Sequence, residues 1–254
     1  SRINVIFFPN ESTGYMAGSR SGSALYTKLL KTTNGGATWD SINTNTRFSA
    51  NSIFFINGLT GFINIFSGWI YKTTNGAASW DSVSNTGSPG KFYFINLNTG
   101  FVYGQNTTFK TTNSGETWTT LSIPSGSFYY NGSDTYTATG DNGSIYRSTN
   151  NGSNWVNYKQ SVYNGYMNKL QAIDENIAYI GCNNGTILKT VNGGNNWIKY
   201  SDSTMDYYQT LHFINSMTGF GAGLSRTSGS SIKKTTNGGL NWNYVNAPNI
   251  FTIF

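Results

Sequence analysis

A short phrase recurs six times along this 254-residue chain, and every copy ends in a tryptophan. The first copy is Thr32-Thr-Asn-Gly-Gly-Ala-Thr-Trp39. The six tryptophans follow one another at intervals of 37 to 45 residues, and they are Trp39, Trp80, Trp118, Trp155, Trp197 and Trp242. This period is the length of a four-stranded propeller blade. We therefore expect an all-β chain that forms a β-propeller of six four-stranded blades.

Each repeat has the same internal order of elements. An apolar strand, a Gly-aromatic strand and a strand ending in Lys-Thr precede the phrase, and a fourth strand begins at its tryptophan. Residues 1–248 are predicted to form a single propeller domain, with blades at about 1–44, 45–85, 86–123, 124–160, 161–203 and 204–248. The tail, 249–254, is similar to the first strand of a repeat, which leaves room for a seventh blade if the chain is a fragment.

The repeated phrase has the chemistry of a structural turn. A hydroxyl residue is followed two positions later by an asparagine whose side chain can hold the amides of the turn, and a following glycine can take a positive φ. These asparagines are Asn34, Asn75, Asn113, Asn150, Asn192 and Asn237. Because a catalytic centre needs one asymmetric cluster, six copies of a phrase indicate scaffold. Alanine replaces the glycine at Ala77 and is expected to soften that turn.

The net charge of +6 does not indicate nucleic-acid binding, because the basic residues are scattered. Six of them occupy one repeat position, eight residues before the tryptophan: Lys31, Lys72, Lys110, Arg147, Lys189 and Lys234. We interpret them as strand residues whose stems cover a neighbouring tryptophan while the charges reach water.

The phrase resembles the Asp-box, or BNR repeat, Ser/Thr-x-Asp-x-Gly-x-Thr-Trp, with asparagine in place of the aspartate. Gly-aromatic strands at Gly14-Tyr15, Gly61-Phe62, Gly100-Phe101 and Gly219-Phe220 add to the likeness. Together they most resemble the repeats of photosystem II assembly factor-like propellers. Similar repeats occur in sortilin-type receptors, sialidases, xyloglucanases and secreted bacterial surface proteins. The resemblance implies a propeller and leaves its function open.

Ligand-binding residues are expected in the loops opposite the repeated phrase, where the blades differ from one another. Trp69 stands out there, because the equivalent position in the other repeats is polar. Its ring could stack on a sugar, bury a partner's side chain, or pack locally on the neighbouring blade. The other candidates are Arg2, Arg20, Arg47, Arg226, Asp206, Tyr207 and Tyr208. The four arginines fall in loops of blades six, one and two, where guanidinium groups could converge on an anion.

No catalytic residues are assigned. A glycosidase requires two carboxylates across a cleft, and Asp141 and Asp206 are the best placed, without support from a motif. Ser1-Arg-Ile-Asn4 only faintly resembles the Phe/Tyr-Arg-Ile-Pro motif of sialidases. His212 is interpreted as a core-strand residue. We predict neither a metal site nor a cofactor, because metal-ligand spacing and phosphate-binding loops are missing from the sequence.

The sequence therefore favours a non-catalytic, secreted, periplasmic or cell-surface propeller that binds a protein partner or a glycan, or serves as a scaffold. Two alternatives remain: an assembly factor-like propeller that binds a membrane-protein complex, and a sialidase-like glycoside hydrolase. A membrane-associated or surface assembly is also among the expected partners. We expect no transmembrane segment and no nucleic-acid partner.

Overall fold

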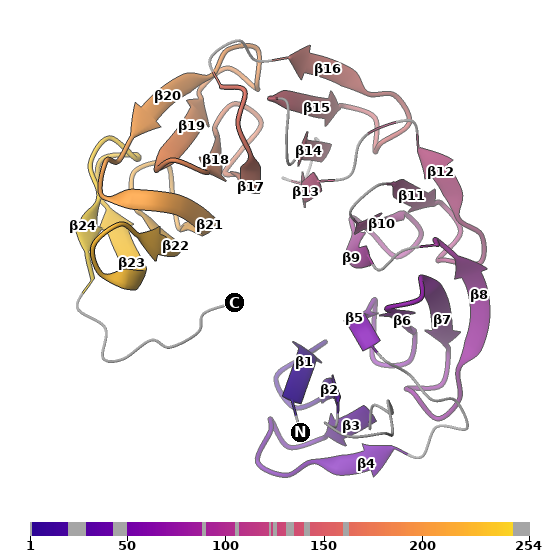
Figure 1. The fold of residues 1–254 in the computed structure, drawn as a ribbon. Coiled ribbons are helices and arrows are strands. Elements are labelled where there is room, and N and C mark those ends of the chain that lie inside the picture. The colour runs from indigo at the N-terminus through magenta and orange to yellow at the C-terminus, as the bar shows by residue number, and fades with distance from the viewer. Residues whose placement is uncertain are drawn as a thin grey trace. The chain divides into compact units, whose positions relative to one another are not determined.

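The computed structural model describes residues 2–19, 29–42, 50–87, 90–104, 107–121, 123, 126–130, 135–139, 143–159 and 163–245. The chain divides into two compact units, Ser1–Pro124 and Ser125–Phe254, and each is described by itself. The described residues form six four-stranded sheets, three in each unit (Figure 1). Within each sheet the strands are antiparallel and follow one another in chain order. We call each sheet a blade and number the blades along the chain.

The first unit holds blades one to three. Their strands are β1 (Arg2–Phe7), β2 (Gly14–Ser19), β3 (Leu29–Thr32) and β4 (Asp40–Ile42), then β5 (Ala50–Phe55), β6 (Gly61–Ile65), β7 (Trp69–Thr73) and β8 (Asp81–Asn85), then β9 (Gly90–Phe94), β10 (Gly100–Gly104), β11 (Thr108–Thr111) and β12 (Thr119–Leu121).

The second unit holds blades four to six. Their strands are β13 (Gly126–Tyr130), β14 (Thr135–Thr139), β15 (Ser144–Ser148) and β16 (Val156–Lys159), then β17 (Met167–Ala172), β18 (Ala178–Cys182), β19 (Thr186–Thr190) and β20 (Ile198–Ser201), then β21 (Met205–Phe213), β22 (Gly219–Ser225), β23 (Gly229–Thr235) and β24 (Asn243–Tyr244). The four strands of each sheet lie within one of the six residue ranges predicted for the blades. The prediction of one domain over 1–248 stays a prediction, and residues 249–254 lie outside the described part of the chain.

The repeated phrase, hereafter the box, forms the turn between the third and fourth strands of each blade. In the first box the Asn34 side chain accepts a hydrogen bond from the amide of Thr38 at 2.9 Å, and the Thr32 hydroxyl accepts one from the amide of Gly36 at 2.9 Å. The indole of Trp39 donates to the carbonyl of Gly36 at 3.1 Å. The same contacts recur in the fifth box, so the predicted role of the asparagine is confirmed.

Two consecutive residues of every box have a positive φ. Glycine suits this conformation because it has no Cβ, and Gly35 and Gly36 occupy it in the first box at 69° and 92°. Ala77, Ser114 and Asn151 adopt the same conformation at 75°, 56° and 55°. The fold therefore imposes the left-handed pair on Ala77 and Ser114, whose residue types do not favour it, at a cost of roughly 1–3 kcal/mol for each residue, whereas asparagine adopts this conformation more readily.

Neighbouring blades within a unit pack through paired aromatic rings. The ring of the Gly-aromatic strand of one blade stacks on an aromatic residue from the first strand of the next. Tyr15 stacks on Phe55 with ring centroids 3.9 Å apart, and Tyr179 stacks on Phe213 at 3.6 Å. Both pairs are buried to within a few per cent of their surface. Burial of these rings accounts for the high aromatic content of the chain.

A basic side chain completes each of these contacts. The ammonium of Lys31 lies 5.5 Å from the centre of the Tyr15 ring and donates to the carbonyl of Gly76, in the box of the next blade, at 3.2 Å. Lys189 repeats the arrangement over Tyr179, with Gly238 as acceptor at 3.3 Å. Lys72 instead forms an ion pair with Glu116 of the next box, and Arg147 donates to the carbonyl of Gly193.

The prediction that these basic residues cover a tryptophan and extend into water is therefore wrong for Lys31, Lys72 and Lys189. Each covers the ring of its own Gly-aromatic strand and bonds to the following blade. A carbonyl in a tight turn has few donors within its own blade, and the cation supplies one.

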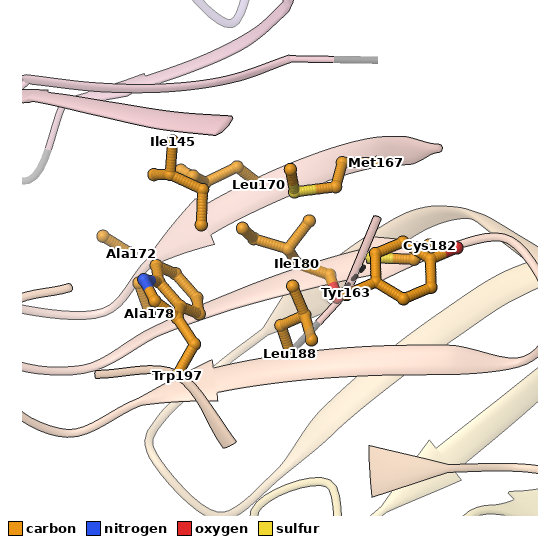
Figure 2. Packing of buried hydrophobic residues seen from close by; sticks show 10 residues of the cluster. All are labelled: Ile145, Tyr163, Met167, Leu170, Ala172, Ala178, Ile180, Cys182, Leu188 and Trp197. Carbon is orange, nitrogen blue, oxygen red and sulfur yellow. Dashed lines mark hydrogen bonds between the residues drawn. The ribbon is translucent and has the colours of Figure 1, made fainter. Parts of the chain in front are cut away.

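Buried apolar residues fill the spaces within and between blades. Figure 2 shows the cluster around blade five, in which Leu170, Ile180 and Leu188 pack with Trp197 of the box. Cys182 lies in this cluster, fully buried, and burial raises the pKa of its thiol. His212, in contrast, is exposed on β21, because alternate side chains of that strand face away from the core, and its interpretation as a core residue is wrong.

Candidate functional site

The two ends of each blade differ in chemistry. The boxes lie at one end, and the turn between the second and third strands lies at the other, which we call the loop end. In the second unit the loop ends of blades five and six are described almost completely. This surface, the blade five–six loop end, comprises residues 163–166, 183–185, 202–207 and 226–228.

An exposed ion pair lies on this surface. The Nε atom of Arg226 is 3.3 Å from Oδ1 of Asp206, and about half of each side chain is exposed. The same Nε donates to the carbonyl of Met205 at 3.3 Å, and the amide of Arg226 donates to the carbonyl of Thr204 at 3.0 Å. The turn after β22 is thereby held against the start of β21. An adjacent donor and acceptor on a fixed backbone suit a ligand with both kinds of group.

Hydrogen bonds join the loop ends of the two blades. The amide of Gly185, in blade five, donates to the carbonyl of Asp206, in blade six, at 3.3 Å, and the side chain of Asn168 donates to the carbonyl of Tyr208 at 2.9 Å. Within blade five, the amide of Asp202 donates to the carbonyl of Gly185 at 2.8 Å. Because these bonds fix the backbone that carries Asp206, little ordering remains to be done when a ligand binds.

A buried ion pair supports this surface from below. Lys233 is 2% exposed, and its ammonium lies 2.6 Å from Oδ2 of Asp202 and also donates to the hydroxyl of Thr204. The Tyr208 hydroxyl donates to the same carboxylate oxygen at 2.7 Å. The pair thus ties the 202–204 turn to β21 and β23. Buried ion pairs depend on such additional hydrogen bonds to offset their desolvation.

The pKa values follow from these contacts. Burial alone would raise the pKa of Asp202, but hydrogen bonds from Lys233, Thr204 and Tyr208 outweigh it and lower the pKa below its ordinary value. Burial raises the pKa of Tyr208, and the neighbouring Asp202 carboxylate raises it further. Asp202 is therefore charged and Tyr208 neutral at neutral pH.

Sequence reasoning missed Lys233, although a signal for it exists. It lies nine residues before the box tryptophan, where the other repeats have Leu30, Tyr71, Phe109, Tyr146 and Leu188. A charged residue at a position that is otherwise apolar indicates a buried partner. Comparing the repeats column by column would have identified it.

Tyr244 closes the outer side of this cluster. The Lys233 ammonium lies 4.4 Å from the centre of its ring, and its hydroxyl is 2.9 Å from the hydroxyl of Ser225. Hydrogen bonding, with Ser225 as the largest contribution and Thr204 next, lowers the pKa of Tyr244 to about 8. Next to it, a groove of about 500 Å³ runs between blades five and six and is lined by residues that include Tyr200, Asp202 and Trp242.

The tyrosines of the blade five–six loop end have different environments. Tyr166 is 54% exposed, and Tyr207 is partly exposed. Tyr208 is fully buried, so we do not keep it among the residues that could face a ligand. Tyr163 is buried, and its hydroxyl donates to the carbonyl of Asn183 at 3.0 Å. Figure 2 shows Tyr163 beside Cys182.

The remaining predicted residues belong to the first unit. Trp69 begins β7 and is 42% exposed. Arg2 begins β1, but its side chain lies outside the described part of the structure, as do Arg20 and Arg47 altogether. The convergence of the four arginines on an anion therefore stays a prediction.

Within the described residues, the carboxylates near the loop end already have partners. Asp202 is paired with Lys233, and Asp206 with Arg226. Asp141, the predicted companion of Asp206, lies outside the described residues. In that part of the chain no group of three or more His, Cys, Asp and Glu side chains could hold a metal ion. Nor does it contain a helix long and apolar enough to cross a membrane.

Repeated four-stranded antiparallel blades with a box in each define a β-propeller, and the prediction of an all-β propeller is confirmed. Comparison with known structures gives the same class. A structure described as YCF48 bound to D1 peptide matches with a TM-score of 0.69 and 16% identity, over 96% of this chain and 80% of that chain.

Two further structures illustrate the range of proteins that share the fold. The GH74 enzyme of Niastella koreensis has a TM-score of 0.66 and 14% identity, over 96% of this chain and 59% of that chain. The computationally designed Ika8 protein has a TM-score of 0.71 and 12% identity, over 95% and 73% of the two chains. No protein-family model and no curated protein matches the sequence. The chain thus resembles photosystem II assembly factor-like propellers in fold, and identities this low carry no activity across.

Proposed function

We propose that this protein is a non-catalytic propeller that recognises a polypeptide partner with its blade five–six loop end. The observation that carries the proposal is the exposed Arg226–Asp206 pair on a backbone held by the buried Lys233–Asp202 pair. Arg226 offers a donor and Asp206 an acceptor, and a polypeptide presents both kinds of group along its length.

Exposed aromatic residues add contact area beside the ion pair. Tyr166 and Tyr207 lie on blades five and six, and tyrosine supplies a large, rigid and amphipathic contact surface. Among the described residues, the side-chain contacts of Arg226 involve Nε alone. The two terminal amino groups are therefore suited to a carboxylate or a carbonyl of the ligand. That a propeller of similar fold is bound to a peptide supports a ligand of this class.

Catalysis is not part of the proposal. The general acid of a glycosidase needs a raised pKa, whereas the pKa of Asp202 is lowered and its oxygens are occupied by donors. Asp206 is bound by Arg226. The likeness to a GH74 enzyme is one of fold, at 14% identity. We expect no hydrolysis of xyloglucan or of sialyl substrates by the purified protein.

We further propose that the propeller functions outside the cytoplasm, in the periplasm, at the cell surface or in the medium. Charged residues make up only 10% of the chain, and asparagine, serine, threonine and tyrosine are abundant in it. Such a surface suits an interface in which polar groups and bridging water molecules contact the partner. Fractionation of cells that produce the full-length protein tests this location, and recovery in the cytoplasm alone would contradict it.

Selection from a displayed library of random peptides tests the recognition proposal. We expect enriched peptides that contain a carboxylate next to an apolar residue, and we expect Arg226→Ala to lower their affinity by about tenfold or more. Lys234→Ala, which changes an exposed basic residue beside the box of blade six, is the matched control and should bind normally. Failure to enrich any peptide, or equal binding by Arg226→Ala, would overturn the proposal.

A further inference from the structure

The hairpin that joins β6 to β7 presents two exposed aromatic side chains at the loop end of blade two. Phe66 is 52% exposed and Trp69 is 42% exposed. The position of Trp69 is occupied by Lys28, Thr107, Ser144, Thr186 and Ser231 in the other repeats. Two exposed aromatic rings on one hairpin offer the kind of apolar surface that marks a binding site. The polypeptide site proposed above lies in the other unit and does not use them.

The turn that carries these rings is fixed by hydrogen bonds. Gly68 has a φ of 85°, and its amide donates to the carbonyl of Ile65 at 2.9 Å, which closes a tight turn. The carbonyl of Gly68 accepts from the amide of Thr86 at 2.9 Å and from the hydroxyl of Thr86 at 2.8 Å. The hairpin is therefore anchored to the chain that follows β8.

A buried asparagine connects the hairpin to the next blade. Asn64 is fully buried, and its Nδ2 atom donates to the carbonyls of Gly68 at 3.2 Å and Trp69 at 3.3 Å. Its Oδ1 atom accepts from the amide of Gly90, in blade three, at 2.6 Å. A side chain that satisfies three backbone groups over two blades holds the backbone of Trp69 in one position.

Asn64 is also a departure from the repeat. The residue two places after the aromatic of the Gly-aromatic strand is Ala17, Tyr103, Gly181 or Ala222 in other described blades. Blade two therefore carries two unusual residues in one hairpin, an exposed tryptophan and the buried amide that fixes its backbone. A local packing role for Trp69 does not account for both, because a ring that is merely covering the core needs no such support.

The described segments that carry and border the rings contain no charged residue. Residues 64–69 and 84–87, which form the hairpin and its neighbouring strand end, contain asparagine, serine, threonine and glycine besides Ile65 and the two rings, and no Asp, Glu, Lys or Arg. The flat faces of Trp69 and Phe66 suit the C–H faces of a pyranose ring, and the amides and hydroxyls suit its hydroxyl groups. A charged polypeptide would find no complementary charge on this hairpin.

We propose that the β6–β7 hairpin, through Trp69 and Phe66, is a binding site for an uncharged oligosaccharide. The site uses residues of the first unit, whereas the polypeptide site uses residues of the second. Each ring contributes stacking area, and Asn64 positions the turn without touching the sugar. The ring of Trp69, being the larger, supplies the greater part of the affinity.

Binding to an array of neutral and acidic oligosaccharides tests the proposal, followed by titration of the best ligand with tryptophan fluorescence. We expect neutral oligosaccharides to bind, with affinity reduced about tenfold or more by Trp69→Ala and several-fold by Phe66→Ala. Trp69→Phe should restore part of the loss. Leu59→Ala, which removes an exposed apolar side chain from the turn between β5 and β6 at the opposite end of the same blade, is the matched control and should not change the affinity.

Two results would overturn this site. One is that no neutral oligosaccharide binds the wild-type protein. The other is that Trp69→Ala binds as well as the wild type while its unfolding transition is unchanged. Sugar binding by Arg226→Ala at wild-type affinity confirms that the two sites are separate.

Discussion

The ammonium of Lys189 lies 3.3 Å from the carbonyl oxygen of Gly238, which is 49 residues later in the chain. The same ammonium lies over the ring of Tyr179, and that ring stacks on Phe213 of the next blade. One basic side chain thus joins the third strand of blade five to the box of blade six. Lys31 makes the same contact with Gly76, so this link between neighbouring blades recurs in the repeat.

Replacing Lys189 with methionine should weaken the contact between blades five and six. The variant keeps most of the apolar stem but loses the hydrogen bond to Gly238, so we expect the free energy of unfolding to fall by about 1 kcal/mol. Urea denaturation measures the change. Lys234→Met is the matched control, because Lys234 is an exposed lysine that lies over Phe220, and it should change stability by less than about 0.5 kcal/mol. Equal effects of the two substitutions would contradict the assigned role.

Substitutions of Asp202 and Lys233, which form the buried ion pair, should have non-additive effects on stability. Asp202→Asn leaves the charge of Lys233 buried without a counter-ion and should destabilise the protein by about 3 kcal/mol. The double variant Asp202→Asn, Lys233→Met should recover most of this loss, because other repeats carry an apolar residue at the lysine position. Additive losses in the two single variants and the double variant would show that the pair does not interact.

The same pair predicts a pH dependence with a definite sign. The folded-state pKa of Asp202 is lowered, so its contribution to stability is complete above the pKa of the unfolded carboxyl, about 4. The contribution is lost as the pH falls through the lowered folded-state pKa. Unfolding curves between neutral and acidic pH should therefore show that the stability of the wild type relative to the double variant is constant above about pH 4 and falls below it. A constant difference across this range would argue against the shift.

Two glycines with a positive φ separate the cost of a steric contact from the cost of backbone strain. A Cβ on Gly115 would overlap Cε1 of the fully buried Phe62, and the φ of Gly115 is 75°. Gly115→Ala should cost about 3 kcal/mol from strain and overpacking together. Gly87 has a similar φ of 70°, but a Cβ there would meet no atom within 4 Å, so Gly87→Ala should cost about 1 kcal/mol. Thermal unfolding of the two variants gives the comparison, and equal losses would show that contact with Phe62 adds nothing.

Tyr244 should titrate at a lower pH than an ordinary tyrosine. Its pKa is lowered to about 8, chiefly by the hydrogen bond with Ser225, so tyrosinate absorbance should increase by about one residue's worth near pH 8. Tyr244→Phe should remove this step, and Ser225→Ala should move it towards the ordinary value. A wild-type titration without any step below about pH 9 would contradict the assignment.

The fold is predictable from the sequence because the box tryptophans recur at the length of a blade. Glycine, asparagine and the hydroxyl residues of each box encode the turn through local hydrogen bonds, and local chemistry is what a single sequence reveals most directly. The contacts between blades are not predictable in the same way. Lys31 and Lys189 bind acceptors 45 and 49 residues away, and nothing near them in the sequence identifies those partners.

The candidate site is predictable only in part. Arg226 and Asp206 stand out because they lie in loops whose sequence differs from repeat to repeat. In the structure they form an exposed ion pair. Tyr208 is adjacent to Tyr207 in the sequence, but a β-strand sends neighbouring side chains to opposite faces, and Tyr208 is buried. Phe66 and Asn64 escape sequence reasoning, since a phenylalanine and an asparagine in a strand–turn segment attract no notice until the exposure of one and the burial of the other are known.

The most direct test of the proposed function is to map the residues that a selected peptide contacts. Amide chemical shifts of the isotope-labelled protein should be followed as the peptide is added. We predict that the largest changes fall within residues 163–166, 183–185, 202–207 and 226–228, and that Arg226→Ala needs about tenfold more peptide, or still more, to reach them. Changes confined to the boxes, or to the first unit, would show that the blade five–six loop end is not the recognition site.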